Sequence, residues 1–414
     1  MAKTVVVIGG GVIGLACAYT LTDAGCDVVV VESGVVAGGA SKGNAGWITP
    51  SLATPLAAPG ILTSGLRSAL DPRGALVIRP SLDTAWLRWL WSFRQAARPE
   101  QFSAGIKALL EMTRRTMEEL DAYRAAGVEF EMHRDGIIAV ARDRSAFHWF
   151  DDTFAELARY GFEGDLVHMD GDEARAAEPA LGDAVGAATR MTIDRHVDPE
   201  SLVRGLAARV GRVIEGAPVT AIAQAGAGWR VRAGSESLVA EAVVVAAGTA
   251  APALLSPFGV RLPIVGAKGY SITARGSGTA PSCALYLCEP KLGLSALDAG
   301  LRIAGFFELG RTDDAVDPAR IRQLVDDTLP FLRDWRPEPG WESTGWAGFR
   351  PATPDSLPLI GEVPGRPGLY VAAGHGMLGF TLGPATGRAV AELVTSGGVP
   401  DWVAPFAVDR AQPG

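Results

Sequence analysis

The sequence predicts an α/β protein of two domains, one of them assembled from separate stretches of the chain. Its 414 residues are enough for two or three domains. The first 32 residues follow the order strand, glycine-rich turn, helix, strand, which is typical of a nucleotide-binding unit. Two later apolar strands, near residues 245 and 370, end on small residues and could complete the same sheet.

Composition excludes several classes of protein. Hydrophobic residues make up 48% and charged residues 20%, as in globular proteins, and the 51 glycines show no Gly-X-Y period. The net charge of −8, without a basic block, argues against a nucleic-acid partner. The four cysteines form no C-x-x-C pair, and with the five histidines they show no zinc spacing, so we expect no metal and reduced thiols in the cytoplasm.

The segment 4–21 is apolar enough to raise a transmembrane helix or a signal peptide as alternatives. Its glycines and β-branched residues favour a strand, a turn and a helix instead. Residues 4–8 form the strand, and a helix from Ile13 to Ala24 follows. Gly9 permits a sharp turn, Gly11 permits the backbone to approach a pyrophosphate, and Gly14 permits the helix to pack on the sheet.

The second strand, 27–31, ends at Glu32, which lies 18 residues after Gly14. An acid at this place binds ribose hydroxyls and repels a 2′-phosphate, which argues against NADP. The motif leaves FAD and NAD both open, as well as an ordinary glycine-rich turn of an unrelated α/β protein.

Three later features favour FAD. The segment 38–46 is a small-residue loop that could lie against a flat ring, although a plain surface loop is the alternative. Strands at 217–222, 229–232 and 238–248 bring distant sequence to the dinucleotide. A strand at 368–374 leads into a helix ending near Thr395, whose positive amino end could face a flavin that becomes anionic on reduction.

These segments resemble the FAD-dependent amino-acid oxidoreductases of the D-amino-acid oxidase, glycine oxidase and sarcosine oxidase superfamily, and most of all the bacterial D-amino-acid dehydrogenases. The resemblance covers nearly the whole chain. Its motifs are the opening glycines, Ser41-Lys-Gly-Asn-Ala-Gly46 with Pro50, Pro263 to Ser271, Gly348-Phe-Arg-Pro-Ala-Thr-Pro-Asp355, Pro358-Leu-Ile-Gly361, and Gly374-His-Gly-Met-Leu-Gly-Phe-Thr381.

The resemblance implies a Rossmann-type FAD-binding domain over 1–80, 195–262 and 350–414. It also implies an α+β substrate domain, built on a large antiparallel sheet, over 81–194 and 263–349. FAD is expected to bind without a covalent link. The expected FAD-binding residues are Gly9, Gly11, Val12, Ile13, Gly14, Glu32, Ser33, Ser41, Asn44, Ala45, Gly46, Val219, Ala247, Gly248, Gly374, His375, Gly376, Met377, Leu378, Gly379 and Thr381.

The resemblance further implies that Arg350 binds the substrate carboxylate, which suits the planar fork of a guanidinium. Tyr270 is a second candidate, for closing the pocket or bonding the carboxylate, and a core tyrosine is its alternative. We expect His375 to position groups rather than act as a base, and His196 to anchor a loop. The expected reaction passes a hydride from the α-carbon of a D-amino acid to flavin N5 and yields a 2-oxo acid and ammonia.

Several alternatives stay open at this point. The enzyme could be a D-proline or D-hydroxyproline dehydrogenase, or an oxidase of the glycine or sarcosine type that uses O₂. It could also be a non-catalytic flavin-binding subunit of a complex, or, more distantly, a nicotinamide dehydrogenase. The expected partners are an amino-acid substrate and an electron acceptor (a quinone, an electron-transfer protein or O₂). The expected location is cytoplasmic, with peripheral contact at the inner membrane face left open and no transmembrane segment.

Overall fold

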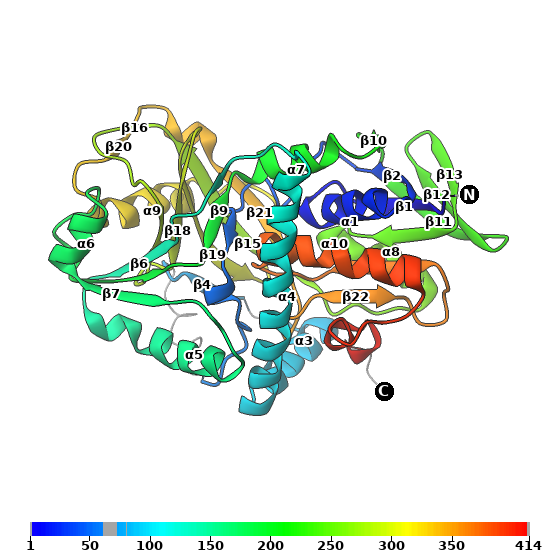
Figure 1. Cartoon of the computed structure of the whole chain (residues 1–414), viewed down its shortest axis with the longest axis horizontal. Coiled ribbons are helices and arrows are strands. Elements are labelled where there is room, and N and C mark those ends of the chain that lie inside the picture. Colours follow the sequence, from blue (N-terminus) through cyan, green and yellow to red (C-terminus); the bar gives the residue numbers. More distant parts are fainter. Residues whose placement is uncertain (1, 61–72, 80, 412–414) are drawn as a thin grey trace.

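The structure is a computed structural model that describes residues 2–60, 73–79 and 81–411. Figure 1 shows two α/β bodies side by side, with the long helix α4 (Pro99–Ala125) running across their junction. The body on the right of Figure 1 holds α1 and α10, and the body on the left holds the larger sheet.

The first body is built on a mostly parallel sheet. Among the described residues six strands lie in the order β10-β2-β1-β14-β23-β22, and only β22 runs antiparallel to its neighbour. Distant stretches of sequence supply them, so the prediction of a discontinuous nucleotide domain is confirmed. The strands are β1 (Thr4–Ile8), β2 (Asp27–Val31), β10 (Arg212–Ile214), β14 (Ala242–Val245), β22 (Leu359–Glu362) and β23 (Leu369–Ala373).

Two helices pack closely on one another beside this sheet. Helix α1 (Val12–Asp23) begins one residue earlier than expected, and α10 (Gly379–Ser396) ends at Gly397 in the left-handed conformation. A Cβ on Gly387 of α10 would lie 2.5 Å from the carbonyl oxygen of Ala16 in α1. The missing side chain therefore lets the two backbones touch, which brings the amino ends of both helices to one edge of the sheet.

The prediction of a single strand over 238–248 is wrong. The structure divides it into β13 (Glu236–Ala240) and β14, which belong to different sheets. Strand β13 completes a three-stranded antiparallel sheet with β11 (Val219–Ala225) and β12 (Gly228–Ala233). An apolar run of this kind carries no mark of the point at which the chain passes from one sheet to the next.

The second body holds the large sheet, in the order β21-β15-β19-β18-β17-β6-β8-β7 with β4 beside β19. Most neighbours are antiparallel, as expected, but β17 with β6 and β19 with β4 are parallel. Strand β4 falls in the range 1–80 that we expected to belong to the other domain. The strands are β4 (Leu76–Ile78), β6 (Ile137–Ala141), β7 (Leu166–Asp170), β8 (Ala187–Met191), β15 (Val265–Ala274), β17 (Ala284–Leu287), β18 (Leu292–Leu297), β19 (Gly300–Leu309) and β21 (Trp346–Ala352).

Short sheets and helices surround these two. The paired short strands are β3 (Trp47–Ile48), β9 (Arg195–Val197) and β5 (Met132–His133), and β16 (Gly276–Ser277) with β20 (Arg336–Pro337). The other α-helices are α3 (Thr84–Ala96), α5 (His148–Arg159), α6 (Gly171–Ala177), α7 (Pro199–Ala207), α8 (Ala251–Leu255) and α9 (Pro318–Thr328).

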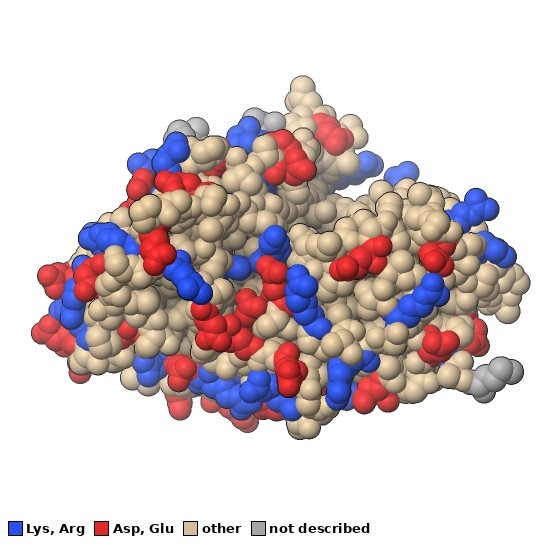
Figure 2. Space-filling view, turned by 90° about the horizontal axis from the view of Figure 1, so that it is seen from above, with Lys and Arg blue, Asp and Glu red and all other residues tan. Residues whose placement is uncertain are grey.

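Charged residues of both signs are mixed over the face drawn in Figure 2, without a broad basic region. Within the described residues, no helix combines the length and the apolar character that a membrane crossing requires.

A buried acid ties the segment after β3 to the loop before β9. Asp194 has no exposed surface, and it accepts hydrogen bonds from the Thr49 hydroxyl (2.7 Å) and the Ser51 amide (3.2 Å). Among the described residues no cation pairs with it. Burial raises the pKa of Asp194 to about 7, because the hydrogen bonds only partly offset the loss of solvent.

Replacing Asp194 with Asn should therefore remove a pH dependence of folding stability. A carboxyl whose pKa is raised from its ordinary value of 3.8 to about 7 in the folded state stabilises the fold fully below pH 3.8. That contribution is lost as the pH rises through 7. We expect the free energy of unfolding of the wild type to fall relative to the Asp194→Asn variant from about pH 4 to about pH 7, as measured by urea unfolding.

The exposed Asp183→Asn change serves as the control, and its difference from the wild type should not vary in this way. Parallel pH profiles for the wild type and Asp194→Asn would contradict the assignment.

Candidate active site

A cavity of about 730 Å³ lies between the two bodies and collects most of the residues expected to bind the cofactor. The first sheet, α1 and α10 form one side of it, and β21 of the large sheet contributes to the other. The expected residues that line it are Gly9, Gly11, Val12, Ile13, Glu32, Ser33, Ser41, Asn44, Val219, Ala247, Gly248, Arg350, His375, Gly376 and Gly379.

The glycine turn at the end of β1 forms the floor of the cavity. Gly9 has φ +117°, and a Cβ there would lie 2.5 Å from the carbonyl oxygen of Ala246 at the end of β14. A Cβ on Gly14 would lie 1.9 Å from the Gly9 carbonyl oxygen. Gly14 therefore acts on helix packing and does not itself line the cavity, while Gly11 does. The amino end of α1, which favours a negative charge, faces the same space.

Glu32 lies at the end of β2 and lines the cavity. One of its oxygens accepts from the Gly10 amide (2.7 Å), and the other accepts from the Ser33 hydroxyl (2.9 Å) and the Gly34 amide (2.8 Å). A carboxylate oxygen can accept more than one bond, so Glu32 keeps capacity for a ribose hydroxyl while it holds the turn.

Residues 38–46, which we call the flavin loop, run along the cavity between the two bodies. Ser41 accepts from the Val12 amide at the start of α1 (3.0 Å), which fixes this end of the loop. Ala45 and Gly46 do not line the cavity. Instead the Ala45 carbonyl accepts from Ser295 (2.6 Å), and a Cβ on Gly46 would lie 2.0 Å from the Val197 carbonyl oxygen, so both residues hold the loop in place.

His375 follows β23 and is buried beside the amino end of α10. Thr386 donates to the Leu382 carbonyl (2.8 Å), so it accepts the Nε2 hydrogen of His375 (3.0 Å). The Nδ1 atom of His375 is buried and has no partner among the described residues. Burial lowers the pKa of His375 to about 3, so the ring is neutral and is a poor base.

Four more expected residues of the carboxyl-terminal segment lie near the cavity but do not line it. Gly374 (φ +84°) turns the chain, Met377 is exposed, and Leu378 precedes the first turn of α10. Thr381 donates to the Trp47 carbonyl (3.1 Å) and accepts from the Thr49 amide (3.2 Å). These residues shape the segment, and their direct contact with FAD stays a prediction.

Arg350 lies on β21, and its side chain passes over Gly269 of the neighbouring β15. A Cβ on Gly269 would lie 1.7 Å from Arg350 Nη1, so only glycine leaves room for the guanidinium. Nη1 donates to the Phe306 carbonyl (2.8 Å), and no carboxylate of the described residues pairs with Arg350. Burial lowers the pKa of Arg350 to about 10, which still leaves it charged at neutral pH. The cavity thus contains a cation that lacks an anion.

Tyr270 is not placed at the cavity. Its side chain is 1% exposed and packs in the core between the large sheet and α9, and its hydroxyl points to Glu308 (3.5 Å). The strands explain the outcome, because Tyr270 is one residue beyond Gly269, whose face carries Arg350, and successive residues of a strand point to opposite faces. The core alternative therefore holds for Tyr270.

His196 is fully buried, and its Nε2 donates to the Ala296 carbonyl (2.9 Å), which agrees with an anchor. Sequence reasoning missed Trp346, whose ring lies against Gly43 of the flavin loop and lines the cavity. It also missed Arg302 of β19, which donates to the flavin loop, and Asp194. The only sequence signal for Trp346 was the pair of glycines, Gly43 and Gly348, that leave room for its ring.

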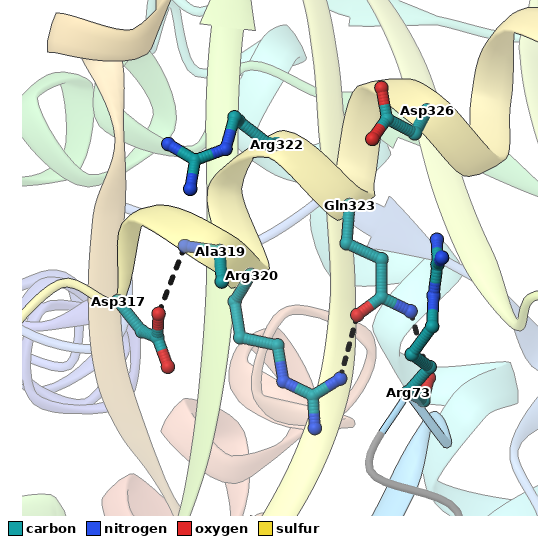
Figure 3. A pocket seen from close by; sticks show the side chains of 7 residues that line it. All are labelled: Arg73, Asp317, Ala319, Arg320, Arg322, Gln323 and Asp326. Atoms are coloured by element: carbon teal, nitrogen blue, oxygen red, sulfur yellow. Dashed lines mark hydrogen bonds between the residues drawn. The ribbon is translucent and has the colours of Figure 1, made fainter.

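A second hollow of about 330 Å³ lies at α9 (Figure 3). Its polar groups largely satisfy one another, since Arg320 donates to Glu308 (2.7 Å) and to Gln323 (2.8 Å), and Gln323 donates to the Arg73 carbonyl (2.8 Å). The hollow therefore serves to attach α9, and it is a weaker candidate for a ligand site than the cavity between the bodies.

The larger cavity fits FAD on its own features. It offers a turn too tight for side chains, the amino ends of two helices for phosphate and reduced-flavin charge, and an acid at the end of β2. It also extends past the flavin loop to a free guanidinium, where a second, anionic molecule can bind beside the cofactor.

Comparison with known proteins agrees with this assignment. Residues 4–393 match the FAD dependent oxidoreductase (DAO) family. D-amino acid dehydrogenase 2 of Ralstonia nicotianae is 33% identical over 98% of this chain and 100% of its own length. D-amino acid dehydrogenase 2 of Pseudomonas aeruginosa is 33% identical over 95% of both chains. Among solved structures, glycine oxidase from Geobacillus kaustophilus covers 100% of both chains with a TM-score of 0.74 at 23% identity, which shows a shared fold. The chain belongs to the DAO family of FAD-dependent oxidoreductases.

Proposed function

We propose that this protein is an FAD-dependent dehydrogenase that oxidises D-amino acids at the α-carbon. The observation that carries the proposal is Arg350, a buried cation without an acid partner at the cavity. A carboxylate that enters the cavity restores the charge balance and forms charge-assisted hydrogen bonds. The D configuration and the dehydrogenase activity rest on the names of the curated relatives.

FAD supplies a two-electron acceptor when it is bound, so that an amino acid becomes an imino acid that water hydrolyses to a 2-oxo acid and ammonia. Arg350 binds and orients the substrate carboxylate, and this fixes the direction of the α-hydrogen. The Phe306 carbonyl, which accepts from Arg350 Nη1, holds the guanidinium in that orientation.

Besides Arg350, the ionisable side chains that line the cavity among the described residues are Glu32, Asp314 and His375. His375 is held neutral with a pKa of about 3, and Glu32 is engaged at the other end, with the glycine turn. Neither His375 nor Glu32 is placed to act as a base, so we propose that the substrate amine loses its proton to water before oxidation. A hydride then leaves from the free amine form without proton abstraction by a side chain.

The electron acceptor that we propose is a quinone or an electron-transfer protein, in keeping with the relatives named dehydrogenases. O₂ is the alternative acceptor, and a quinone would bring the protein to a membrane surface.

An anaerobic titration of the purified holoprotein tests the function. The absorbance of the flavin band at about 450 nm is followed while amino acids are added. The amino acids are D-alanine, D-proline and D-phenylalanine, with glycine, sarcosine and the matching L forms as comparisons. We expect D-amino acids to bleach the band, with slow recovery when air is admitted.

Fast recovery in air would replace the dehydrogenase with an oxidase, and bleaching by D-proline alone would narrow the substrate to cyclic imino acids. A yellow protein that no amine bleaches would contradict the proposal and favour a non-catalytic flavin-binding subunit.

Replacement of Arg350 with Met should raise KM for the amino acid while FAD remains bound. Charge-assisted hydrogen bonds to a carboxylate are worth about 1.5–3 kcal/mol, so KM should rise between about 10-fold and 100-fold. The measurements are steady-state kinetics and the flavin content of the purified variant.

Arg195→Met is a suitable control, because Arg195 pairs with Asp121 outside the cavity. An unchanged KM in Arg350→Met would show that the carboxylate binds elsewhere.

A further inference from the structure

The face of the large sheet that carries Arg350 also carries a second buried guanidinium. Arg302 of β19 lies opposite Thr273 of β15, and Trp346 of β21 lies opposite Ser271 of β15. Residues that lie opposite one another, and residues two or four apart on one strand, share a face. Arg302 and Arg350 are therefore on the same face, which is turned toward the flavin loop.

Arg302 is 7% exposed and uses its donors on the flavin loop. Its Nη1 donates to the carbonyls of Lys42 (2.9 Å) and Asn44 (2.7 Å), and its Nε donates to the Thr273 hydroxyl (2.5 Å). The next carbonyl, that of Ala45, accepts from Ser295 of β18. The substrate domain therefore holds three carbonyls of a loop whose other side borders the cavity.

This arrangement sets the direction of the loop's amide groups. In a trans peptide the C=O and the following N–H point in opposite directions. Since the Lys42 carbonyl points at Arg302, the Gly43 amide points away from it. Gly43 lines the cavity, and its amide has no hydrogen-bond partner among the described residues. Arg302 thus leaves an N–H available to a ligand in the cavity.

The charge of Arg302 is not neutralised by contact with an acid. Burial lowers its pKa, Asp198 and Glu200 act on it only at a distance, and the described residues place no carboxylate in an ion pair with it. Ser295 shows that a neutral hydroxyl is enough to hold one of these carbonyls. The positive charge of Arg302 is therefore not needed to attach the loop. Its electric field acts on a ligand that lies on the cavity side of the loop.

We infer that Arg302 is a positioning residue that holds the flavin loop in the shape that binds FAD, and that its charge makes the bound flavin easier to reduce. Reduction adds negative charge to the flavin, and a nearby buried cation stabilises that charge. The inference rests on the proposal that FAD occupies this cavity with its ring against the flavin loop.

The test compares Arg302→Lys, Arg302→Gln and Arg302→Met with Thr273→Val. The Lys variant keeps the charge, and the Gln and Met variants remove it. Thr273→Val removes one acceptor of Arg302 without a change of charge. For each protein the FAD dissociation constant of the apoprotein and the midpoint reduction potential of the holoprotein are measured. KM and kcat are also measured, with an amino acid that the wild type oxidises.

We expect Arg302→Met to bind FAD at least about tenfold more weakly. The midpoint potential should fall in Arg302→Gln and Arg302→Met, and stay near that of the wild type in Arg302→Lys and Thr273→Val. The value of kcat should fall with the potential while KM changes little, since the carboxylate is bound by Arg350.

Wild-type potential and FAD affinity in a folded Arg302→Gln or Arg302→Met variant would overturn the inference. If the midpoint potential fell equally in the Arg302→Lys and Arg302→Gln variants, the charge of Arg302 would not be what matters. Arg302 would then only attach the loop, and the claim that its charge makes the flavin easier to reduce would be overturned. If the wild type bound FAD but no amino acid reduced it, only the proposed function would be contradicted. The inference on Arg302 would still be tested, because the FAD affinity and the midpoint potential are measured without substrate.

Discussion

The site depends on backbone segments that approach one another too closely for side chains. Strand β1 ends beside β14, and at Gly9 the backbone passes so near the Ala246 carbonyl that a Cβ would lie 2.5 Å from it. The same is true where Gly14 meets the Gly9 carbonyl and where Gly387 meets that of Ala16. These contacts bring the amino ends of α1 and α10 to one edge of the parallel sheet. The cavity is the space left at that edge, and these contacts place the glycine turn after β1 and the two helix ends beside it.

The substrate domain completes this space with charge. Arg350 and Arg302 lie on one face of a sheet whose other face packs against α9, and neither has an acid in contact among the described residues. Burial of an unpaired cation costs free energy, and an anion that binds nearby returns part of it. Beside the segment that follows β3, the Asp194 carboxyl has a pKa of about 7 and accepts two hydrogen bonds, and no cation among the described residues pairs with it. The cavity is also lined by two carboxylates, Glu32 and Asp314, so an anionic ligand is favoured by the local charge of Arg350 and not by a net positive balance.

Much of this arrangement could be predicted from the sequence where a local pattern has one structural meaning. The glycines of the turn, the acid of Glu32 and the strand before His375 follow directly from spacing, and most of those residues line the cavity. The Gly-Phe-Arg-Pro segment identified Arg350 only through resemblance to a family. Pairing between distant strands was beyond reach, because nothing local to residues 238–248 marks the change of sheet near Glu241.

The residues that sequence reasoning missed were missed for a common reason. Arg302, Asp194 and Trp346 stand in ordinary strand or loop contexts, and their roles arise from what faces them across the domain junction. The prediction that Tyr270 lies at the substrate pocket failed for a related reason, because the face of the sheet on which a residue lies depends on the register of its strand. Its neighbour Gly269 is the residue that matters, through the room it leaves for Arg350. A residue that acts through its own side-chain chemistry is thus easier to find from the sequence. A residue that leaves room for another side chain, or holds it by a hydrogen bond, is harder to find.

The ionisation states at the cavity also restrict the chemistry open to this protein. A neutral His375 with Nε2 committed to Thr386 cannot take a proton from a substrate at neutral pH, and Arg350 is charged throughout that range. Oxidation through a carbanion needs a base at the α-hydrogen, whereas hydride transfer needs only orientation and an acceptor. The chain supplies orientation through a guanidinium that is itself held by the Phe306 carbonyl. A site of this composition favours hydride transfer from an amine that has already lost its proton to water.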